Sequence, residues 1–213
     1  MNKAVIFDMD GVIIDSESLW KQAEFEVFSS LGVTITEEYS RQTKTMTTNE
    51  VAKFWYDKNP WETISLEAAE QMVVMRVIKL IQTHSCQIVG IKPFIEKLKA
   101  CNYKIGLATN SPLQIIPVVL NKLNVFHLFD AISSAELEIK GKPDPAIYLN
   151  TAEKLEVTPD GCIVIEDSYS GMLAAKNAGM VVVAFTNGNC DIEFDIADYK
   201  ITSFEDHGLD VFK

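Results

Sequence analysis

Short runs of apolar, largely β-branched residues recur along the chain and predict a set of strands. These runs are residues 4–8, 104–109, 131–135, 162–167 and 181–185. All but the third are almost continuously apolar, which is typical of parallel strands covered on both faces. Segments with helical patterns lie between the later runs, at 93–101, 113–124, 145–156 and 169–178. The alternation predicts an α/β fold built on a doubly wound parallel sheet, with a Rossmann-like core.

The stretch between the first and second predicted strands does not alternate in this way. Residues 16–86 show no convincing strand pattern but carry apolar residues at helical spacing, for example from Leu66 to Leu80 with Ser65 as the N-cap. We therefore expect an all-helical cap at 16–86. It would be inserted into an α/β core formed by residues 1–15 and 87–213.

Composition and charge limit the classes of partner. The chain has 213 residues, of which 47% are hydrophobic and 23% charged, as in ordinary globular proteins. Its formal net charge of −11 argues against nucleic-acid and acidic-membrane partners. The apolar run at the N-terminus is too short for a signal peptide or a membrane span, and the four scattered cysteines are typical of buried, reduced thiols. We expect a cytoplasmic protein and, without an obvious interface stripe, a monomer.

Acidic and hydroxyl side chains follow three of the predicted strands. Asp8 and Asp10 end the first run, Thr109 ends the second, and Glu166 and Asp167 end the fourth. Ligands of an open parallel sheet bind beyond the carboxyl ends of its strands, so these side chains should share one edge. Carboxylates that close together need a cation. Magnesium (Mg2+) favours one or two carboxylates with water and a phosphate oxygen, which suits Asp8 and Asp167.

A phosphate substrate would give each of these residues a task. Asp8 can attack phosphorus to form an aspartyl-phosphate, and Asp10 can protonate the leaving alkoxide and then deprotonate the attacking water. The Thr109 hydroxyl and the Asn110 backbone N–H can bind phosphate oxygens, while Lys142 supplies a cation. The sequence therefore predicts phosphoryl-transfer chemistry.

Four segments resemble, in order and spacing, the four motifs of the haloacid dehalogenase-like (HAD) hydrolase superfamily. They are DMDG at 8–11, ATNS at 108–111, GKPDP at 141–145 and IEDSYSG at 165–171. The insertion after the first motif is similar to the helical cap of the subgroup that contains β-phosphoglucomutase and small sugar phosphatases. Three further segments look like the bacterial 2-deoxyglucose-6-phosphatase/hexitol phosphatase branch, namely DSESLWKQAE at 15–24, FWYDKNPW at 54–61 and SAELEIKGKPDP at 134–145.

The resemblance implies a role for each of these groups. Asp8 would be the nucleophile and Asp10 the acid/base. The magnesium ligands would be Asp8, Asp167 and the backbone carbonyl of Asp10, with Glu166 supporting the ion through water or from the second shell. The phosphoryl group would be bound by Thr109 and Lys142.

Two features depart from the pattern of the family. The third motif reads Lys-Pro-Asp-Pro-Ala from Lys142, whereas many relatives have Lys-Pro-x-Pro-Asp with the acid two positions after the place of Asp144, and we assign Asp144 no role. Trp20 occupies the place where mutase relatives have a His that distinguishes sugar phosphate from water. We therefore expect a magnesium-dependent phosphatase acting on hexose, hexitol or 2-deoxyglucose-6-phosphate-like esters through phospho-Asp8. The alternatives are a β-phosphoglucomutase-type isomerase and a phospho-aspartate signalling module. A signalling module would lack both the helical insertion and a counterpart of Asp10.

The pattern of apolar and polar residues does not show which cap residues would bind the sugar. Trp55, Tyr56 and Trp61 lie at spacings that are more typical of a helical core than of ligand contacts. The polar segment 40–50 is a candidate for sugar recognition, although its basic residues are equally consistent with solvated surface.

Overall fold

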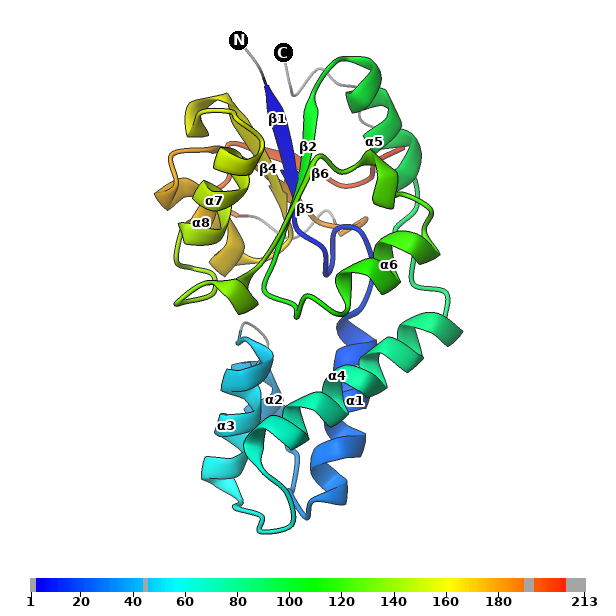
Figure 1. Cartoon of the computed structure of the whole chain (residues 1–213), viewed down its shortest axis with the longest axis vertical. Coiled ribbons are helices and arrows are strands. Elements are labelled where there is room, and N and C mark those ends of the chain that lie inside the picture. Colours follow the sequence, from blue (N-terminus) through cyan, green and yellow to red (C-terminus); the bar gives the residue numbers. More distant parts are fainter. Residues whose placement is uncertain (1–2, 44–45, 190–193, 206–213) are drawn as a thin grey trace.

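A six-stranded parallel sheet forms the centre of the α/β core (Figure 1). The computed structural model describes residues 3–43, 46–189 and 194–205. Within them the strands lie in the order β3-β2-β1-β4-β5-β6, and every neighbouring pair is parallel. The strands are β1 Ala4–Phe7, β2 Lys104–Thr109, β3 Ala131–Ser134, β4 Cys162–Glu166, β5 Val181–Phe185 and β6 Tyr199–Ile201. The predicted doubly wound sheet is confirmed.

Helices cover both faces of the sheet, which explains why its central strands are apolar throughout. On β1, Val5 and Phe7 pack into a cluster with residues of α5 (Ile91–Ala100) and α6 (Ile116–Lys122). Their neighbours Ala4 and Ile6 point to the other face and pack with α7 (Ala146–Lys154) and α8 (Tyr169–Asn177). Because successive side chains alternate between the faces of a strand, a strand buried on both sides must be apolar at every position.

The register of the sheet brings the functional strand ends to one level. Phe7 of β1 is aligned with Leu107 of β2 and with Ile165 of β4. The residues that follow these positions therefore leave the sheet together. The chain runs outward from β1 in both directions, so this edge lies at the switch in strand order where open α/β sheets bind ligands.

Four helices form a separate bundle beyond the carboxyl ends of the strands (Figure 1). They are α1 Glu17–Ser30, α2 Glu37–Thr43, α3 Thr48–Lys58 and α4 Leu66–Thr83. Ser65 caps α4 by accepting a hydrogen bond from the Ala68 N–H at 3.2 Å, as expected from the sequence. Thr47 and Glu50 form a reciprocal capping box at the start of α3. The limits of 16 and 86 for this cap stay a prediction.

The aromatic residues of the cap form its hydrophobic core. Trp55 is fully buried, and its ring lies 6.2 Å from that of Phe28. Trp61 is also buried, 5.9 Å from Phe28 and 5.0 Å from Tyr56. The interpretation of these three aromatic residues as core is therefore confirmed for Trp55 and Trp61, while Tyr56 is partly exposed.

Two elements were not expected from the sequence. The short helix α2 occupies the start of the polar segment 40–50, and it lacks the apolar stripe that would have indicated a helix. The edge strand β6 has only one fully buried residue, Ile201. Residues 44–45 of the polar segment lie outside the described part of the chain, as does Cys190. Among the described residues, no helix combines the length and apolar character needed to cross a membrane.

Candidate active site

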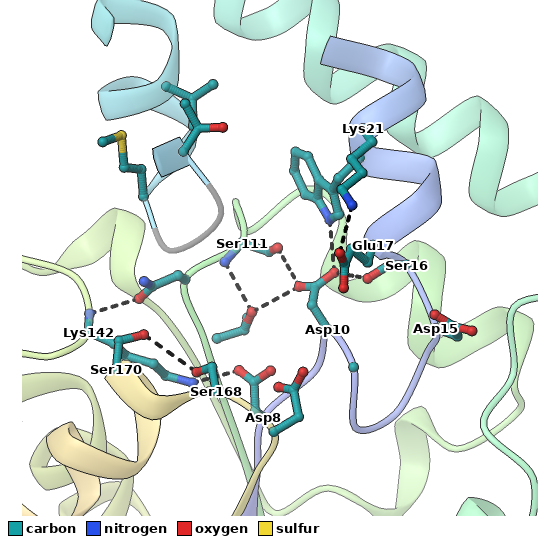
Figure 2. Close-up of a pocket in the computed structure, with 18 of the residues that line it drawn as sticks. Asp8, Asp10, Asp15, Ser16, Glu17, Lys21, Ser111, Lys142, Ser168 and Ser170 are labelled. Atoms are coloured by element: carbon teal, nitrogen blue, oxygen red, sulfur yellow. Dashed lines mark hydrogen bonds and ion pairs between the residues drawn. The ribbon is translucent and has the colours of Figure 1, made fainter. Parts of the chain in front are cut away.

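The predicted site residues line one cavity between the strand ends and the cap (Figure 2). Its volume is about 390 Å³, within the usual range for small-molecule sites. The members predicted from the sequence that lie on its wall are Asp8, Asp10, Thr109, Asn110, Lys142, Glu166 and Asp167. The core therefore brings together residues that are up to 159 positions apart, as the alignment of β1, β2 and β4 requires.

A tight turn after β1 places the first two carboxylates. The Asp8 N–H continues the sheet by donating to the Ile165 carbonyl at 3.0 Å. Gly11 then adopts a φ of +81°, and a Cβ there would lie 2.1 Å from Oδ2 of Asp167. Only glycine satisfies both the backbone conformation and the close approach. The turn therefore holds Asp8 and Asp10 against the end of β4.

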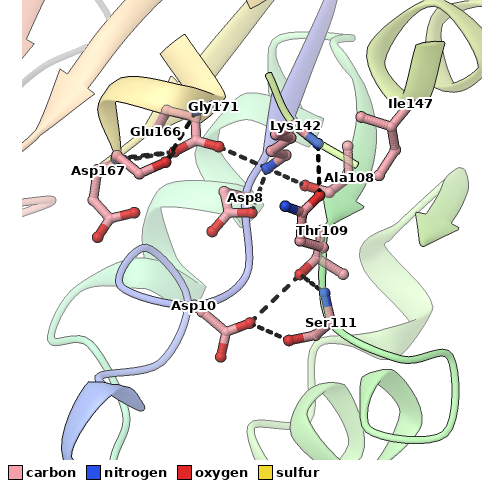
Figure 3. A network of polar contacts seen from close by, with 12 residues as sticks. Asp8, Asp10, Ala108, Thr109, Ser111, Lys142, Ile147, Glu166, Asp167 and Gly171 are labelled. Carbon is pink, nitrogen blue, oxygen red and sulfur yellow. Dashed lines mark hydrogen bonds and ion pairs between the residues drawn. The ribbon is translucent and has the colours of Figure 1, made fainter. Parts of the chain in front are cut away.

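Lys142 is a buried ammonium group held by three oxygens (Figure 3). Its Nζ donates to Asp8 Oδ1 at 2.6 Å, to Glu166 Oε1 at 2.6 Å and to the Ala108 carbonyl at 2.9 Å. Burial alone would lower the pKa of Lys142, but the charges of Asp8 and Glu166 outweigh it and raise that pKa well above its usual value. Lys142 therefore remains charged beside the predicted nucleophile.

Glu166 is completely buried and both of its oxygens are engaged. Oε1 accepts from Lys142 and from the Tyr148 hydroxyl at 2.9 Å. Oε2 accepts from the Asp167 and Ser168 backbone N–H groups at 3.1 and 3.0 Å, and from the Ser168 hydroxyl at 2.9 Å. This set of donors suits a carboxylate that fixes Lys142 and the start of α8. The predicted support of a metal ion by Glu166 stays a prediction.

The acidic cluster has the composition of a site for a hard cation. Ligand oxygens of Asp8, Glu166 and Asp167 all lie within 4.8 Å of one another. Burial, followed by the charge of Glu166, raises the pKa of Asp167 to about 8. Burial also raises the pKa of Asp8 well above its usual value, although Lys142 opposes the shift. A divalent cation would stabilise both carboxylates in their charged forms, and oxygen-only ligands suit magnesium or calcium.

Asp10 accepts hydrogen bonds from side chains of the cap and of the core (Figure 2). Its Oδ1 accepts from the Ser16 hydroxyl at 2.5 Å and from the Trp20 indole N–H at 2.9 Å. Its Oδ2 accepts from the Ser111 hydroxyl at 2.6 Å and from the Thr109 hydroxyl at 3.4 Å. Thr109 thus faces Asp10 in this structure.

Asn110 lies next to the lysine loop. Its side-chain Oδ1 accepts the Lys142 backbone N–H at 3.0 Å, which ties the end of β2 to that loop. The prediction for Asn110 concerned its backbone N–H, and a phosphate contact there stays a prediction.

Sequence reasoning did not single out several residues that build the site. They are Ser16, Ser111, Tyr148 and Gly171, together with the hydrogen bond from Trp20 to Asp10. Ser111 and Gly171 belong to the conspicuous segments at 108–111 and 165–171, so their positions carried a signal. Tyr148 had none, because one aromatic residue on a buried helical face predicts packing.

Comparison with known proteins identifies the family. A family model described as haloacid dehalogenase-like hydrolase matches residues 5–185, which include all four motif segments. The chain belongs to this family. The resemblance seen in the sequence is confirmed, and with it the assignment of the chain to an enzyme family.

Individual relatives of this haloacid dehalogenase-like hydrolase cover nearly the whole chain. Hexitol phosphatase B of Escherichia coli (strain K12) is 37% identical over 203 residues, which are 94% of this chain and 91% of the relative. A phosphorylated carbohydrates phosphatase of Thermotoga maritima is 33% identical over 84% of this chain and 82% of its own length. A crystal structure of β-phosphoglucomutase from Clostridium difficile has a TM-score of 0.87 at 27% identity, covering 100% of this chain and 96% of that chain.

The first prediction concerns Gly171 of α8. A Cβ at this position would lie 1.7 Å from Oε1 of Glu166. Gly171→Ala should therefore destabilise this hydrolase by about 1–3 kcal/mol, although alanine normally favours a helix. Thermal unfolding measures the effect, with Asn177→Ala on the exposed end of the same helix as the control. An unchanged Tm in Gly171→Ala would show that Glu166 can move aside without loss.

The second prediction concerns the cation. Magnesium at 100 times its Kd should stabilise the metal-free protein by about 2.7 kcal/mol, or roughly 5–10 °C in Tm. Asp167→Asn should abolish this response. Without metal, the same change should raise Tm, because it removes a half-buried carboxylate beside Glu166. A magnesium response that survives in Asp167→Asn would place the cation elsewhere.

Proposed function

We propose that this chain is a magnesium-dependent phosphatase that hydrolyses phosphate esters of small sugars or sugar alcohols through a phospho-Asp8 intermediate. The observation that carries the proposal is that two carboxylates on the same turn, Asp8 and Asp10, have different hydrogen-bond partners. Asp8 contacts the buried Lys142 ammonium, whereas Asp10 is held by hydroxyl and indole donors at the cavity wall. The first arrangement suits a nucleophile, and the second suits a group that exchanges protons.

In the first step, a carboxylate oxygen of Asp8 attacks phosphorus while the bond from phosphorus to the ester oxygen breaks. The leaving alkoxide takes a proton from Asp10. Lys142 lies beside Asp8 and balances negative charge on the phosphoryl oxygens. Magnesium, held by Asp8 and Asp167 when bound, would supply further charge neutralisation.

In the second step, Asp10 removes a proton from a water molecule whose oxygen attacks phosphorus. The bond between phosphorus and Asp8 breaks, inorganic phosphate leaves, and Asp10 is protonated for the next cycle. The water must enter only after the alcohol has left, and the cap that covers the strand ends provides such control by opening and closing.

The sugar or polyol assignment is supported by the relatives whose names refer to hexitol and to phosphorylated carbohydrates. The similarity to a β-phosphoglucomutase keeps isomerisation as the second candidate. Trp20 favours hydrolysis, because its indole N–H donates to Asp10 and has no lone pair with which to relay a proton. A signalling module is disfavoured by the shared cavity between core and cap.

The proposal extends to a cytoplasmic monomer without nucleic-acid or membrane partners. The net charge of −11 supports the exclusion of polyanionic partners. Among the described residues, Cys86, Cys101 and Cys162 are free thiols, as is typical of a reducing compartment.

Phosphate release from a panel of esters tests the proposed reaction. With magnesium, the enzyme should release inorganic phosphate from hexitol or hexose phosphates faster than from glycerol or glycolate phosphates, and EDTA should abolish the release. β-Glucose 1-phosphate is included to detect isomerisation. Conversion of that compound to an isomer, without phosphate release from any ester, would establish a mutase instead.

Substitution of the two aspartates tests their roles separately. Asp8→Asn should release no phosphate. Asp10→Asn should slow turnover by about 10²–10⁴-fold and accumulate phosphoenzyme when the leaving group is p-nitrophenolate, which needs little protonation. Intact-mass analysis detects the added phosphoryl group, and Asp8→Asn is the control that should remain unmodified. A phosphoryl adduct on Asp8→Asn would exclude Asp8 as the nucleophile.

A further inference from the structure

The cavity continues past the catalytic carboxylates into the cap. Helix α1 presents one face to it, with Glu17, Trp20, Lys21, Glu24 and Phe28 on the cavity wall. Their spacing of three and four residues is that of a single helical stripe. Trp20 marks the end next to Asp10, and Glu24 follows one turn later. Glu24 is thus displaced from Trp20 by about 6 Å along the helix axis.

Glu24 is a carboxylate without a cationic partner among the described residues, and its surroundings are largely apolar. Lys21, the nearest basic residue on α1, forms an ion pair with Glu17 at 2.9 Å (Figure 2). Phe28 and Val51 line the same part of the cavity. Burial raises the pKa of Glu24 to about 7, an effect that the Trp55 indole and the Thr43 hydroxyl oppose. Glu24 is therefore costly to bury unless a ligand compensates it.

Two polar side chains that interact with Glu24 also have hydrogen-bonding capacity to spare. The Trp55 side chain is fully buried, and its Nε1 makes no hydrogen bond of normal geometry among the described residues, the Glu24 carboxylate being the acceptor that it approaches. Thr43 lies on the cavity wall, where its one hydroxyl proton can be donated either to the Ser40 carbonyl at 3.2 Å or to the Glu24 carboxylate, and its oxygen lone pairs can accept from a ligand. Buried polar groups normally have partners, and Glu24 and Thr43, unlike Trp55, lie on the cavity wall, so their oxygens can accept hydrogen bonds from a polar ligand.

The chemistry of the ligand follows from the two ends of the cavity. Lys142 and the cation site take the phosphate ester, whereas the carboxylate of Glu24 repels a second anion and accepts hydrogen bonds from hydroxyl groups. Because Glu24 lies a helical turn beyond the contact of Trp20 with Asp10, only a substrate with several carbons reaches it.

We propose that Glu24, assisted by Thr43, determines specificity by accepting hydrogen bonds from the distal hydroxyl groups of a polyol or sugar phosphate. This inference rests on the proposed phosphatase function and names the part of the substrate that the cap recognises.

Steady-state kinetics of Glu24→Gln with two substrates test the inference. Sorbitol 6-phosphate carries distal hydroxyl groups, and p-nitrophenyl phosphate carries none. Glu24→Gln should lower kcat/KM for sorbitol 6-phosphate by about 10- to 100-fold, mainly through KM, because a charged acceptor of hydroxyl groups is lost. The value for p-nitrophenyl phosphate should stay within about twofold of the wild type, as expected for hydroxyl-specific recognition.

Glu26→Gln provides the matched control. Glu26 lies on the same helix but pairs with Arg76 at the surface, so its substitution should change neither value. Thermal unfolding of Glu24→Gln should give an unchanged or raised Tm, because a buried charge is removed.

An equal loss on both substrates, or no loss on either, would overturn the specificity role while leaving the phosphatase assignment intact. A wild-type enzyme that hydrolyses neither substrate would instead refute the phosphatase proposal, and the role of Glu24 with it.

Discussion

The active site depends on one buried ammonium group. Lys142 joins three parts of the core that are distant in sequence, because its Nζ contacts Asp8 after β1, Ala108 in β2 and Glu166 at the end of β4. Two carboxylates at this level of burial would repel each other and lose hydration. With Lys142 between them, each is paired, and loss of this one cation would leave two uncompensated buried charges. The same contact places a fixed positive charge beside Asp8, the proposed nucleophile.

Space is the second constraint, and it explains the glycines of two motif segments. A side chain at Gly11 would occupy the position of the Asp167 carboxylate, and one at Gly171 would occupy that of Glu166. The acidic cluster is therefore compact because the neighbouring backbone has no Cβ atoms at these points. Burial, together with the nearby carboxylates, raises the pKa values of Asp8 and Asp167, and a divalent cation would stabilise their charged forms. Stability is thus given up at the place where we propose that the metal and the substrate phosphate bind.

Much of the fold, and the gathering of the candidate site residues around one cavity, could be predicted from the sequence because both depend on local patterns. Apolar runs indicated the strands. Asp8, Thr109 and Asp167 could be singled out because each lies at the end of a strand or directly after it. The contacts between side chains were not predictable in this way. The bond from Trp20 to Asp10 depends on how α1 leaves the core, and Tyr148 reaches Glu166 only through the packing of α7 against the sheet. Helix α2 and strand β6 were missed because neither short segment carries a clear apolar period.

Asp10 accepts hydrogen bonds from both the cap and the core. The four donors restrict which of its two oxygens can carry a proton. At Oδ1 the indole N–H of Trp20 can only donate, so a proton there would have the Ser16 hydroxyl as its one possible acceptor among the four groups bonded to Asp10. Oδ2 faces the hydroxyl groups of Ser111 and Thr109, which can rotate and accept. The acid form of Asp10 is therefore best accommodated with its proton on Oδ2, while Trp20 holds Oδ1 from the cap. A histidine in the place of Trp20 could exchange protons with the substrate, whereas tryptophan can only orient Asp10. In the proposed mechanism, the cap therefore orients Asp10 through Trp20, and proton transfer is left to Asp10 itself.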